Sequence, residues 1–401
     1  MRFVLKKWHN IFLLNIETFL LFAMIIVTSW AYLMPTTFFD EIITILLFFN
    51  IIFTHKKLNK SFLKTIIFYV IWCSGGLLVN RRINLYALIQ LFDNLKPILI
   101  LLCILAIRMT KERIELFLKM FEIVNFPSVV IGILTAYMYN YLHLNRIIES
   151  GTLKRYGNDI ILRAGGLTGH SGAFTETCAI LFLLVLFQEK NSIKKWIKIV
   201  FYALGLYCGR GRFPLVITIL GVFWYIWGKL SKRSQKYLGV FISFVASILL
   251  YPIFQYIKNT FMYDFNNQIR FHALKIVFIL LTKVLFFGVG VGNIGNINSI
   301  TNNYDLYLNL NMIKYGYIDW ESHLAKCLLQ TGIIGTIIWY FPFFKCLFRV
   351  YYTKQSKYKD ILLFLISYYI INSFINKSYN LPFLLLLCAL ISSKYYENNY
   401  R

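Results

Sequence analysis

Apolar stretches separated by short polar segments recur along the whole chain. They lie near 11–34, 38–54, 62–79, 84–107, 120–142, 172–189, 194–208, 211–229, 237–256, 324–348, 361–376 and 380–396. An α-helix needs about 20 apolar residues to cross the hydrocarbon core of a bilayer. The pattern therefore predicts an all-α polytopic membrane protein with about 12 transmembrane helices, in one integral membrane domain over residues 1–401. Because several stretches are short, a count of about ten or eleven also fits.

Composition excludes an ordinary soluble domain. Hydrophobic residues make up 58% of the chain, charged residues 15%, and the mean hydropathy is +0.62, whereas soluble domains are about a quarter charged. The seven cysteines lie in or beside apolar stretches without a CxxC pair, so we expect neither a disulfide framework nor a zinc site. The first apolar stretch lacks the short core and cleavage site of a signal peptide, and we expect it to be retained.

Basic residues divide the loops into two alternating sets. With both termini on one side, the loops on that side carry these residues: Lys56, Lys57, Lys60, Arg108, Lys111, Arg113, Lys190, Lys194, Lys195, Lys229, Lys232, Arg233, Lys236, Lys345, Arg349, Lys354, Lys357 and Lys359. This lysine-rich set follows the positive-inside rule and predicts cytoplasmic loops. The net charge of +25 therefore reflects membrane topology, and we expect no nucleic-acid partner.

The opposite loops are richer in arginine. Most are short, but the segments 143–171 and 257–322 are long, and we interpret both as large external loops. Gln268–Thr282 is apolar but interrupted by charge, which predicts an interfacial helix within the second loop. Topology needs only positive charge, whereas the planar guanidinium also holds phosphate or carboxylate in two-point contact. The arginine bias therefore predicts that an anion binds on this side.

Two candidate motifs lie near the middle of the chain. The first is Arg163-Ala-Gly-Gly-Leu-Thr-Gly-His170-Ser-Gly, and Glu176 follows about one turn into the next apolar stretch. The second is the very short loop Gly209-Arg210-Gly-Arg212. Arginine, histidine and glycine at a membrane mouth favour ligand binding, and a carboxylate within a span is functional or paired. The simpler alternatives are a flexible helix entry and a tight hairpin with snorkelling arginines.

Two further motifs lie in and after the second long loop. Arg270-Phe-His272 is followed by a glycine-rich run in which Gly290, Gly292 and Gly295 spell GxGxxG. No βαβ pattern surrounds this run, so it predicts close backbone approach to a ligand or a neighbouring helix and not dinucleotide binding. The second motif is Asp319-Trp-Glu321-Ser-His323, whose carboxylate and imidazole are candidates for a general base, or else polar residues that cap a helix.

Taken in order, three segments resemble the bacterial O-antigen ligase and polymerase superfamily. The segments are RAGGLTGHSG, IRFHALKIVFILLTKVLFFGVGVGNIG and ESHLAKCLLQTGIIG, within about 160–345. The resemblance implies a GT-C-like, metal-independent glycosyltransferase without a cofactor. Such enzymes act at the outer face of the bacterial cytoplasmic (inner) membrane on undecaprenyl-pyrophosphate-linked oligosaccharide. A chain-length regulator and a flippase are the protein partners that the family implies, beside membrane lipid.

The order of residues favours a polymerase of the Wzy class over a ligase. Ligases carry a histidine, commonly followed by asparagine, at the position where this chain has Glu321 followed by Ser322. A ligase that transfers glycan to lipid A-core, and a flippase or transporter of lipid-linked oligosaccharide, remain the alternatives. By hypothesis Glu321, His323 and Arg270 are catalytic, and these residues bind substrate: Arg163, Arg210, Arg212, His170, His272 and Glu176.

Overall fold

The computed structural model describes about two thirds of the chain, mostly as α-helices. It covers residues 16–34, 39–80, 85–107, 109–144, 151–156, 159–188, 190–231, 234, 277, 285–294, 322–352, 359–375 and 381–397. The helices are α2 (Ile16–Ser29), α3 (Phe39–Phe53), α4 (Lys60–Val79), α5 (Leu85–Ile107), α6 (Lys111–Tyr141), α7 (Ser171–Gln188), α8 (Ile193–Gly209), α9 (Arg212–Lys229), α14 (His323–Tyr352), α15 (Lys359–Ile375) and α16 (Leu381–Glu397). The described residues also form strands β1 (Thr152–Tyr156) and β2 (Asp159–Arg163) and the 3-10 helix η1 (Gly166–Thr168).

The helices coincide with the predicted apolar stretches, but the predicted count of about 12 spans is not supported. Five described helices are long and apolar enough to cross a membrane, namely α4, α5, α6, α7 and α14. Among the other described helices, α9 has 18 residues like α7 but is less apolar. The remaining five have 14 to 17 residues, which is about 21–26 Å at 1.5 Å per residue, against a hydrocarbon core of about 30 Å. The predicted stretch 237–256 lies outside the described residues.

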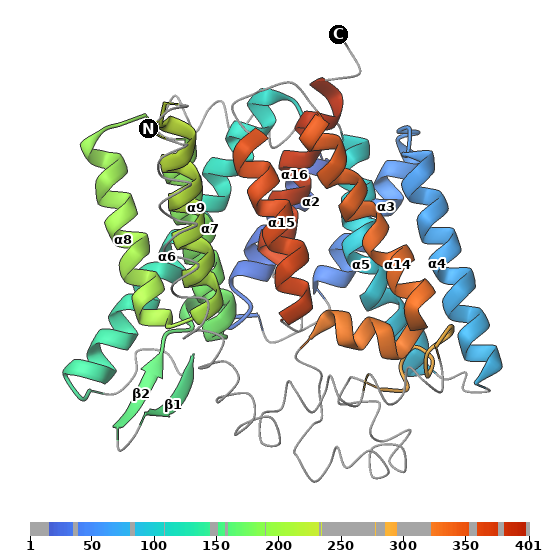
Figure 1. Cartoon of the computed structure of the whole chain (residues 1–401), viewed down its shortest axis with the longest axis horizontal. Coiled ribbons are helices and arrows are strands. Elements are labelled where there is room, and N and C mark those ends of the chain that lie inside the picture. The colour runs from blue at the N-terminus through green and yellow to red at the C-terminus, as the bar shows by residue number, and fades with distance from the viewer. Residues whose placement is uncertain are drawn as a thin grey trace.

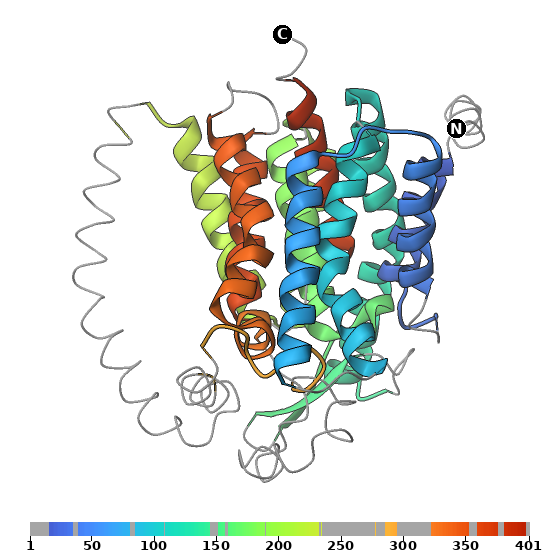
Figure 2. The same ribbon diagram turned by 90° about the vertical axis from the view of Figure 1, so that its right-hand side faces the viewer.

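Successive helices run up and down through one bundle (Figure 1). The central helix α7 packs against α8 and α9, while α16 packs against α5, α6 and α2. In the turned view of Figure 2 the helices stand side by side, with the β-hairpin below them. Helix α16 therefore packs into a core that it shares with α2, α5 and α6, which come from the first third of the chain.

The two ends of the bundle carry different basic residues. The lysine-rich segments 54–60 and 190–195 connect helices, and Lys229 ends α9, at the end that is uppermost in Figure 1, which we call the lysine end. The β-hairpin and the turn between α8 and α9 lie at the lower end, which we call the hairpin end. The loops predicted to lie on opposite sides of the membrane are thus at opposite ends of the bundle.

The segment 143–171 contains an antiparallel β-hairpin, which its reading as a loop missed. Thr152 pairs with Arg163 and Tyr156 pairs with Asp159. Asn140 near the end of α6 holds the second strand, because its side chain both donates to the Leu162 carbonyl (2.9 Å) and accepts from the Leu162 amide (2.8 Å). The hairpin is therefore fastened to the bundle, close to the first candidate motif.

The segment 257–322 lies largely outside the described residues. The predicted interfacial helix Gln268–Thr282 falls there as well, with one of its residues, Val277, described as helical and buried. Residues 285–294 are described, and they pack against α14.

Candidate functional site

Arg163 and the turn between α8 and α9 meet at the hairpin end. The Arg163 Nε donates a hydrogen bond to the Gly209 carbonyl at 3.2 Å, and the Ala164 amide donates to the Cys208 carbonyl at 3.0 Å. The end of β2 therefore lies on the last residues of α8. Two motifs that are 46 residues apart in sequence become one local structure.

Glycine allows this turn to approach α7 closely. A Cβ atom on Gly209 would lie 2.4 Å from the Thr175 Oγ1, and one on Gly211 would lie 2.8 Å from the Thr175 Cβ. Thr175 belongs to the first turns of α7 and is fully buried. The glycines on both sides of Arg210 thus seat the turn against the N-terminal end of α7.

Arg210 ends α8 in a strained backbone conformation. Its φ of 51° and ψ of 32° lie in the left-handed region, where a residue with a Cβ costs about 1–2 kcal/mol. Its amide donates to the Leu206 carbonyl at 3.0 Å, and its guanidinium lies 5.7 Å from the centre of the Tyr207 ring. The backbone conformation at this position favours glycine, so the arginine is present at a cost in backbone strain.

Arg212 and His170 are two further basic groups at this end. Arg212 is exposed and begins α9, whose N-cap residue Gly211 offers no side-chain acceptor. His170 is exposed just before α7, and its Nδ1 accepts the Gly172 amide at 3.1 Å. The hydroxyl of the next residue, Ser171, is hydrogen-bonded to Thr152 of the hairpin at 2.9 Å.

We call Arg163, Arg210 and Arg212 the arginine cluster. They lie beside the first turns of α7 and α9, where helix N-termini carry partial positive charge. Guanidinium groups and helix N-termini both favour anions, and phosphate in particular. The arrangement is therefore suited to holding an anionic group at the hairpin end.

Glu176 lies inside the bundle, away from the surface of the cluster. It is 6% exposed, and its Oε1 accepts hydrogen bonds from the Tyr368 hydroxyl (2.7 Å) and the Asn372 amide (2.8 Å). Both donors belong to α15. The structure thus places this substrate-binding candidate in a contact between α7 and α15.

His323 is also buried, at the start of α14. Its ring is 2% exposed, with Nε2 at 3.2 Å from the Cys327 Sγ and the ring centre at 4.3 Å from that of Trp339. Trp339 packs on Tyr340, whose hydroxyl is hydrogen-bonded to Ser373 at 2.9 Å. Because Ser373 follows the Glu176 partner in sequence, one turn of α15 connects the surroundings of His323 with those of Glu176.

The glycine-rich segment 285–294 closes a break in α14. Gly332 has φ 69° and ψ −172° in the middle of that helix, which interrupts its hydrogen bonding. The amides of Val289 and Gly290 donate to the carbonyls of Leu329 (2.7 Å) and Gln330 (3.1 Å). The predicted close approach of the glycines is therefore to a neighbouring helix. The hydrogen bonds of this segment pair backbone carbonyls next to the break in α14.

Polar side chains that the sequence analysis did not select support this junction. Gln90 donates to Asn94 (3.0 Å), and Asn94 donates to Gln330 (2.9 Å). Gln330 in turn donates to the Ile294 carbonyl at 2.6 Å. All three side chains are at most 1% exposed. Their signal in the sequence is that each is an amide within an apolar stretch.

Three site candidates, Arg270, His272 and Glu321, lie outside the described residues. Among the residues that are described, no group of three or more His, Cys, Asp or Glu side chains is placed to hold a metal ion. Comparison of the sequence with protein-family models and with curated proteins gave no match.

Proposed function

We propose that this chain is a polysaccharide polymerase that joins undecaprenyl-pyrophosphate-linked oligosaccharide units at the outer face of the bacterial cytoplasmic membrane. The observation that carries the proposal is the arginine cluster, in which Arg163 of the hairpin lies on the Gly209–Arg212 turn. The cluster is at the end opposite the lysine-rich segments. By the positive-inside rule the hairpin end would then face outward, where the lipid-linked donor is used.

The proposed reaction transfers a glycosyl group without an external energy source. An acceptor hydroxyl attacks the anomeric carbon of the donor, and the bond from that carbon to the pyrophosphate oxygen breaks. The hydroxyl proton passes to the Glu321 carboxylate, and the lipid pyrophosphate leaves with the bonding electron pair. Negative charge then concentrates on the leaving group, where fixed positive charge lowers the barrier most.

The arginine cluster would supply that stabilisation. One charge-assisted hydrogen bond contributes roughly 1.5–3 kcal/mol, and about 1.4 kcal/mol corresponds to a tenfold change in rate. Two such bonds would therefore accelerate the transfer by roughly two to four powers of ten. Arg270 and His272 belong to the same proposed donor site on the basis of the sequence resemblance.

The two buried candidates receive different roles. The burial of His323 against Trp339 favours a positioning role at the start of α14, next to Glu321 in sequence. Glu176 would hold α15 against α7 beneath the arginine cluster. Both residues would support the site without touching the sugar.

A complementation assay tests the proposed reaction. In a strain lacking this chain, we expect single lipid-linked repeat units, and the wild-type gene restores long polymer. Arg212→Lys keeps the charge but loses the guanidinium fork, and we expect shorter polymer because two-point contact with phosphate is lost. Lys229→Arg, at the lysine end, is the matched control and should leave polymer length unchanged.

The same assay separates the alternatives. A ligase mutant would leave carrier-linked polymer together with bare lipid A-core, and a flippase mutant would retain repeat units on the inner leaflet. Polymer of full length from both Arg212→Lys and Arg163→Lys would exclude the proposed two-point contact.

Topology mapping tests the orientation independently. Leu153 is exposed in β1 and Lys190 is exposed at the lysine end, while the native cysteines are buried apart from the half-buried Cys208. We expect a membrane-impermeant maleimide to label Leu153→Cys in intact cells and to label Lys190→Cys only after lysis. The reverse result would place the arginine cluster in the cytosol and exclude the proposed reaction.

A further inference from the structure

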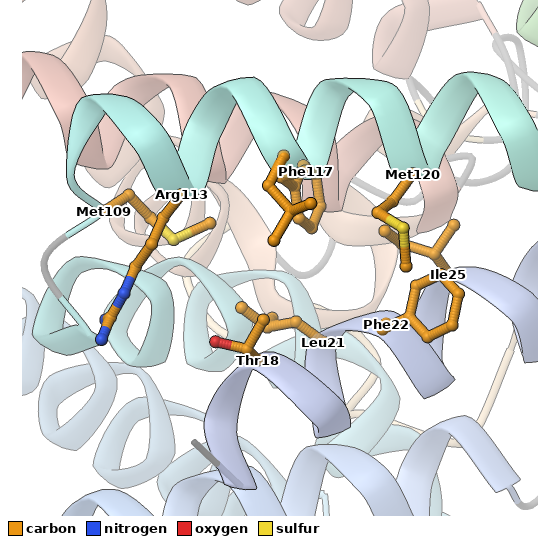
Figure 3. A pocket seen from close by; sticks show the side chains of 9 residues that line it. Thr18, Leu21, Phe22, Ile25, Met109, Arg113, Phe117 and Met120 are labelled. Atoms are coloured by element: carbon orange, nitrogen blue, oxygen red, sulfur yellow. The ribbon is translucent and has the colours of Figure 1, made fainter. Parts of the chain in front are cut away.

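A narrow slot lies between α2 and α6 at the lysine end (Figure 3). All the empty space between its walls, open solvent included, amounts to about 360 Å³, so the slot is shallow and narrow. Most of its wall is apolar, and its polar groups are one hydroxyl and one guanidinium. The side chains that matter here are those of Thr18, Leu21, Phe22, Arg113, Phe117 and Met120.

The polar groups gather at one end of the slot. Figure 3 shows the Arg113 guanidinium and the Thr18 hydroxyl at this end, with Phe22 and Met120 at the other. Thr18 lies in the first turn of α2, and Arg113 lies in the first turn of α6. Since both helices begin at the lysine end, the polar groups mark the mouth and the apolar groups line the interior.

Arg113 has no ion-pair partner among the described residues. The other basic groups near the membrane surface include Lys56, which pairs with Glu17, and Lys198, which pairs with Glu122. Arg113 is half-buried, and the contact made near it is between its backbone amide and the helix-capping Thr110. Its positive charge is therefore available to an anionic group at the mouth of the slot.

We infer that this slot binds an anionic phospholipid, with the phosphate at Arg113 and Thr18 and an acyl chain between α2 and α6. The guanidinium and hydroxyl supply donors to phosphate oxygens, while Leu21, Phe22 and Phe117 accept the hydrocarbon. Basic residues at the lysine-rich end of a membrane protein attract anionic headgroups. A small soluble anion would use the mouth alone and leave the apolar interior without an occupant.

The site is separate from the arginine cluster. The slot opens at the lysine end, whereas Arg163 and Arg210 lie at the hairpin end. Its occupant is therefore a lipid of the opposite leaflet and not the donor proposed above. The inference does not depend on the proposed reaction.

Lipid binding to the purified full-length protein tests the inference. In detergent, increasing amounts of dioleoylphosphatidylglycerol should raise the melting temperature by several degrees, as expected for a ligand that binds the native state. Equal amounts of dioleoylphosphatidylcholine should have a much smaller effect, and inorganic phosphate none. Arg113→Gln should weaken phosphatidylglycerol binding roughly tenfold, because one charge-assisted contact is lost.

Two variants distinguish the slot from general surface charge. Lys119→Gln removes one exposed positive charge from the same helix but lies outside the slot lining, so it should bind phosphatidylglycerol like wild type. Leu116→Trp fills the slot while keeping Arg113 and should also lose binding. Each variant is compared only if its gel-filtration peak matches that of the wild type.

Three results would overturn the inference. One is equal stabilisation by phosphatidylcholine, which would mean that headgroup charge is not recognised. Another is unchanged phosphatidylglycerol binding by Arg113→Gln. The last is binding that occurs only after removal of residues 1–15, which would assign the slot to the first residues of the chain itself.

Discussion

Glu176 of α7 accepts a hydrogen bond from the Asn372 amide of α15 at 2.8 Å, across 196 positions of sequence. The same carboxylate oxygen accepts the Tyr368 hydroxyl at 2.7 Å. Both donors come from one helix, four residues apart, so the carboxylate bridges one turn of α15. Glu176, which its sequence context marks as a ligand-binding candidate, therefore has two structural partners on a neighbouring helix.

Replacing Glu176 by alanine should destabilise the bundle more than replacing it by the neutral glutamine. Glu176→Ala leaves two buried donors unsatisfied, which costs about 1–3 kcal/mol for each group. Glu176→Gln keeps an acceptor oxygen and should cost less. Thermal unfolding in detergent measures both variants. If Glu176→Gln instead kept wild-type stability and lost polymer formation entirely, Glu176 would contact substrate.

Replacing Arg210 by glycine should separate stability from activity. Glycine removes the left-handed strain of about 1–2 kcal/mol, so the melting temperature of Arg210→Gly should rise or stay unchanged. Polymer length should fall, because the guanidinium of the cluster is lost. His55 has a similar φ of 50° at the lysine end, so His55→Gly relieves strain there without touching the cluster and should retain full activity.

Gly332 should not tolerate any side chain. A Cβ atom at this position would lie 2.0 Å from the Phe286 carbonyl oxygen, and its φ of 69° is one that L-residues rarely adopt. We expect Gly332→Ala to lower stability by more than about 3 kcal/mol, as overpacking and backbone strain act together. Gly228 in α9 has open space around it, and Gly228→Ala should be neutral or stabilising. A Gly332→Ala protein that melts like wild type would mean that α14 is not broken at this glycine.

Lys96 should be needed for stability only while its partners Asp40 and Glu41 carry negative charge. Its Nζ lies 2.5 Å from the Asp40 Oδ2 and 2.6 Å from the Glu41 Oε1, with 6% of its side chain exposed. Lys96→Met leaves two carboxylates without a cation and should cost about 3–5 kcal/mol, whereas the triple variant with Asp40→Asn and Glu41→Gln should regain most of that loss. Thermal unfolding of both proteins checks this, and a triple variant no more stable than Lys96→Met would contradict it.

A milder loss is expected at the more exposed ion pair between Lys198 and Glu122. Lys198 and Glu122 are 36% and 27% exposed, and such pairs contribute about 0–1 kcal/mol. Lys198→Met is therefore the matched control for Lys96→Met and should change the melting temperature little.

The sequence pattern was sufficient to locate the described helices. Apolar stretches such as 62–79 and 84–107 correspond to α4 (Lys60–Val79) and α5 (Leu85–Ile107) within two residues. Hydropathy succeeds here because a helix in a bilayer must pair its backbone N–H and C=O groups by hydrogen bonds within itself and surround them with apolar side chains. The same measure overestimated the number of spans, since it records polarity along the chain and tolerates helices that are too short to cross alone.

The sequence pattern did not predict which distant segments contact each other. No periodicity indicates that Gln330 pairs with Asn94, or that Glu176 pairs with Asn372, because these partners depend on which helix faces pack together. The β-hairpin did leave a signal. Gly157-Asn158 separates two five-residue strands, and a Gly-Asn pair between such runs is typical of a tight hairpin turn. The alternating pattern was obscured by the surrounding loop of mixed polarity.

Two glycines, Gly288 and Gly332, pack together at the break in α14. A Cβ on Gly288 would lie 2.4 Å from the Leu329 carbonyl oxygen, and one on Gly332 would collide with the Phe286 carbonyl on the facing segment. A side chain at either glycine would disrupt the same contact between the 285–294 segment and α14. The losses of stability from the two substitutions should therefore not add. We therefore expect homologous proteins either to have glycine at both positions or to have another residue at both. Correlated substitution of these two positions would then indicate which homologues have a broken α14.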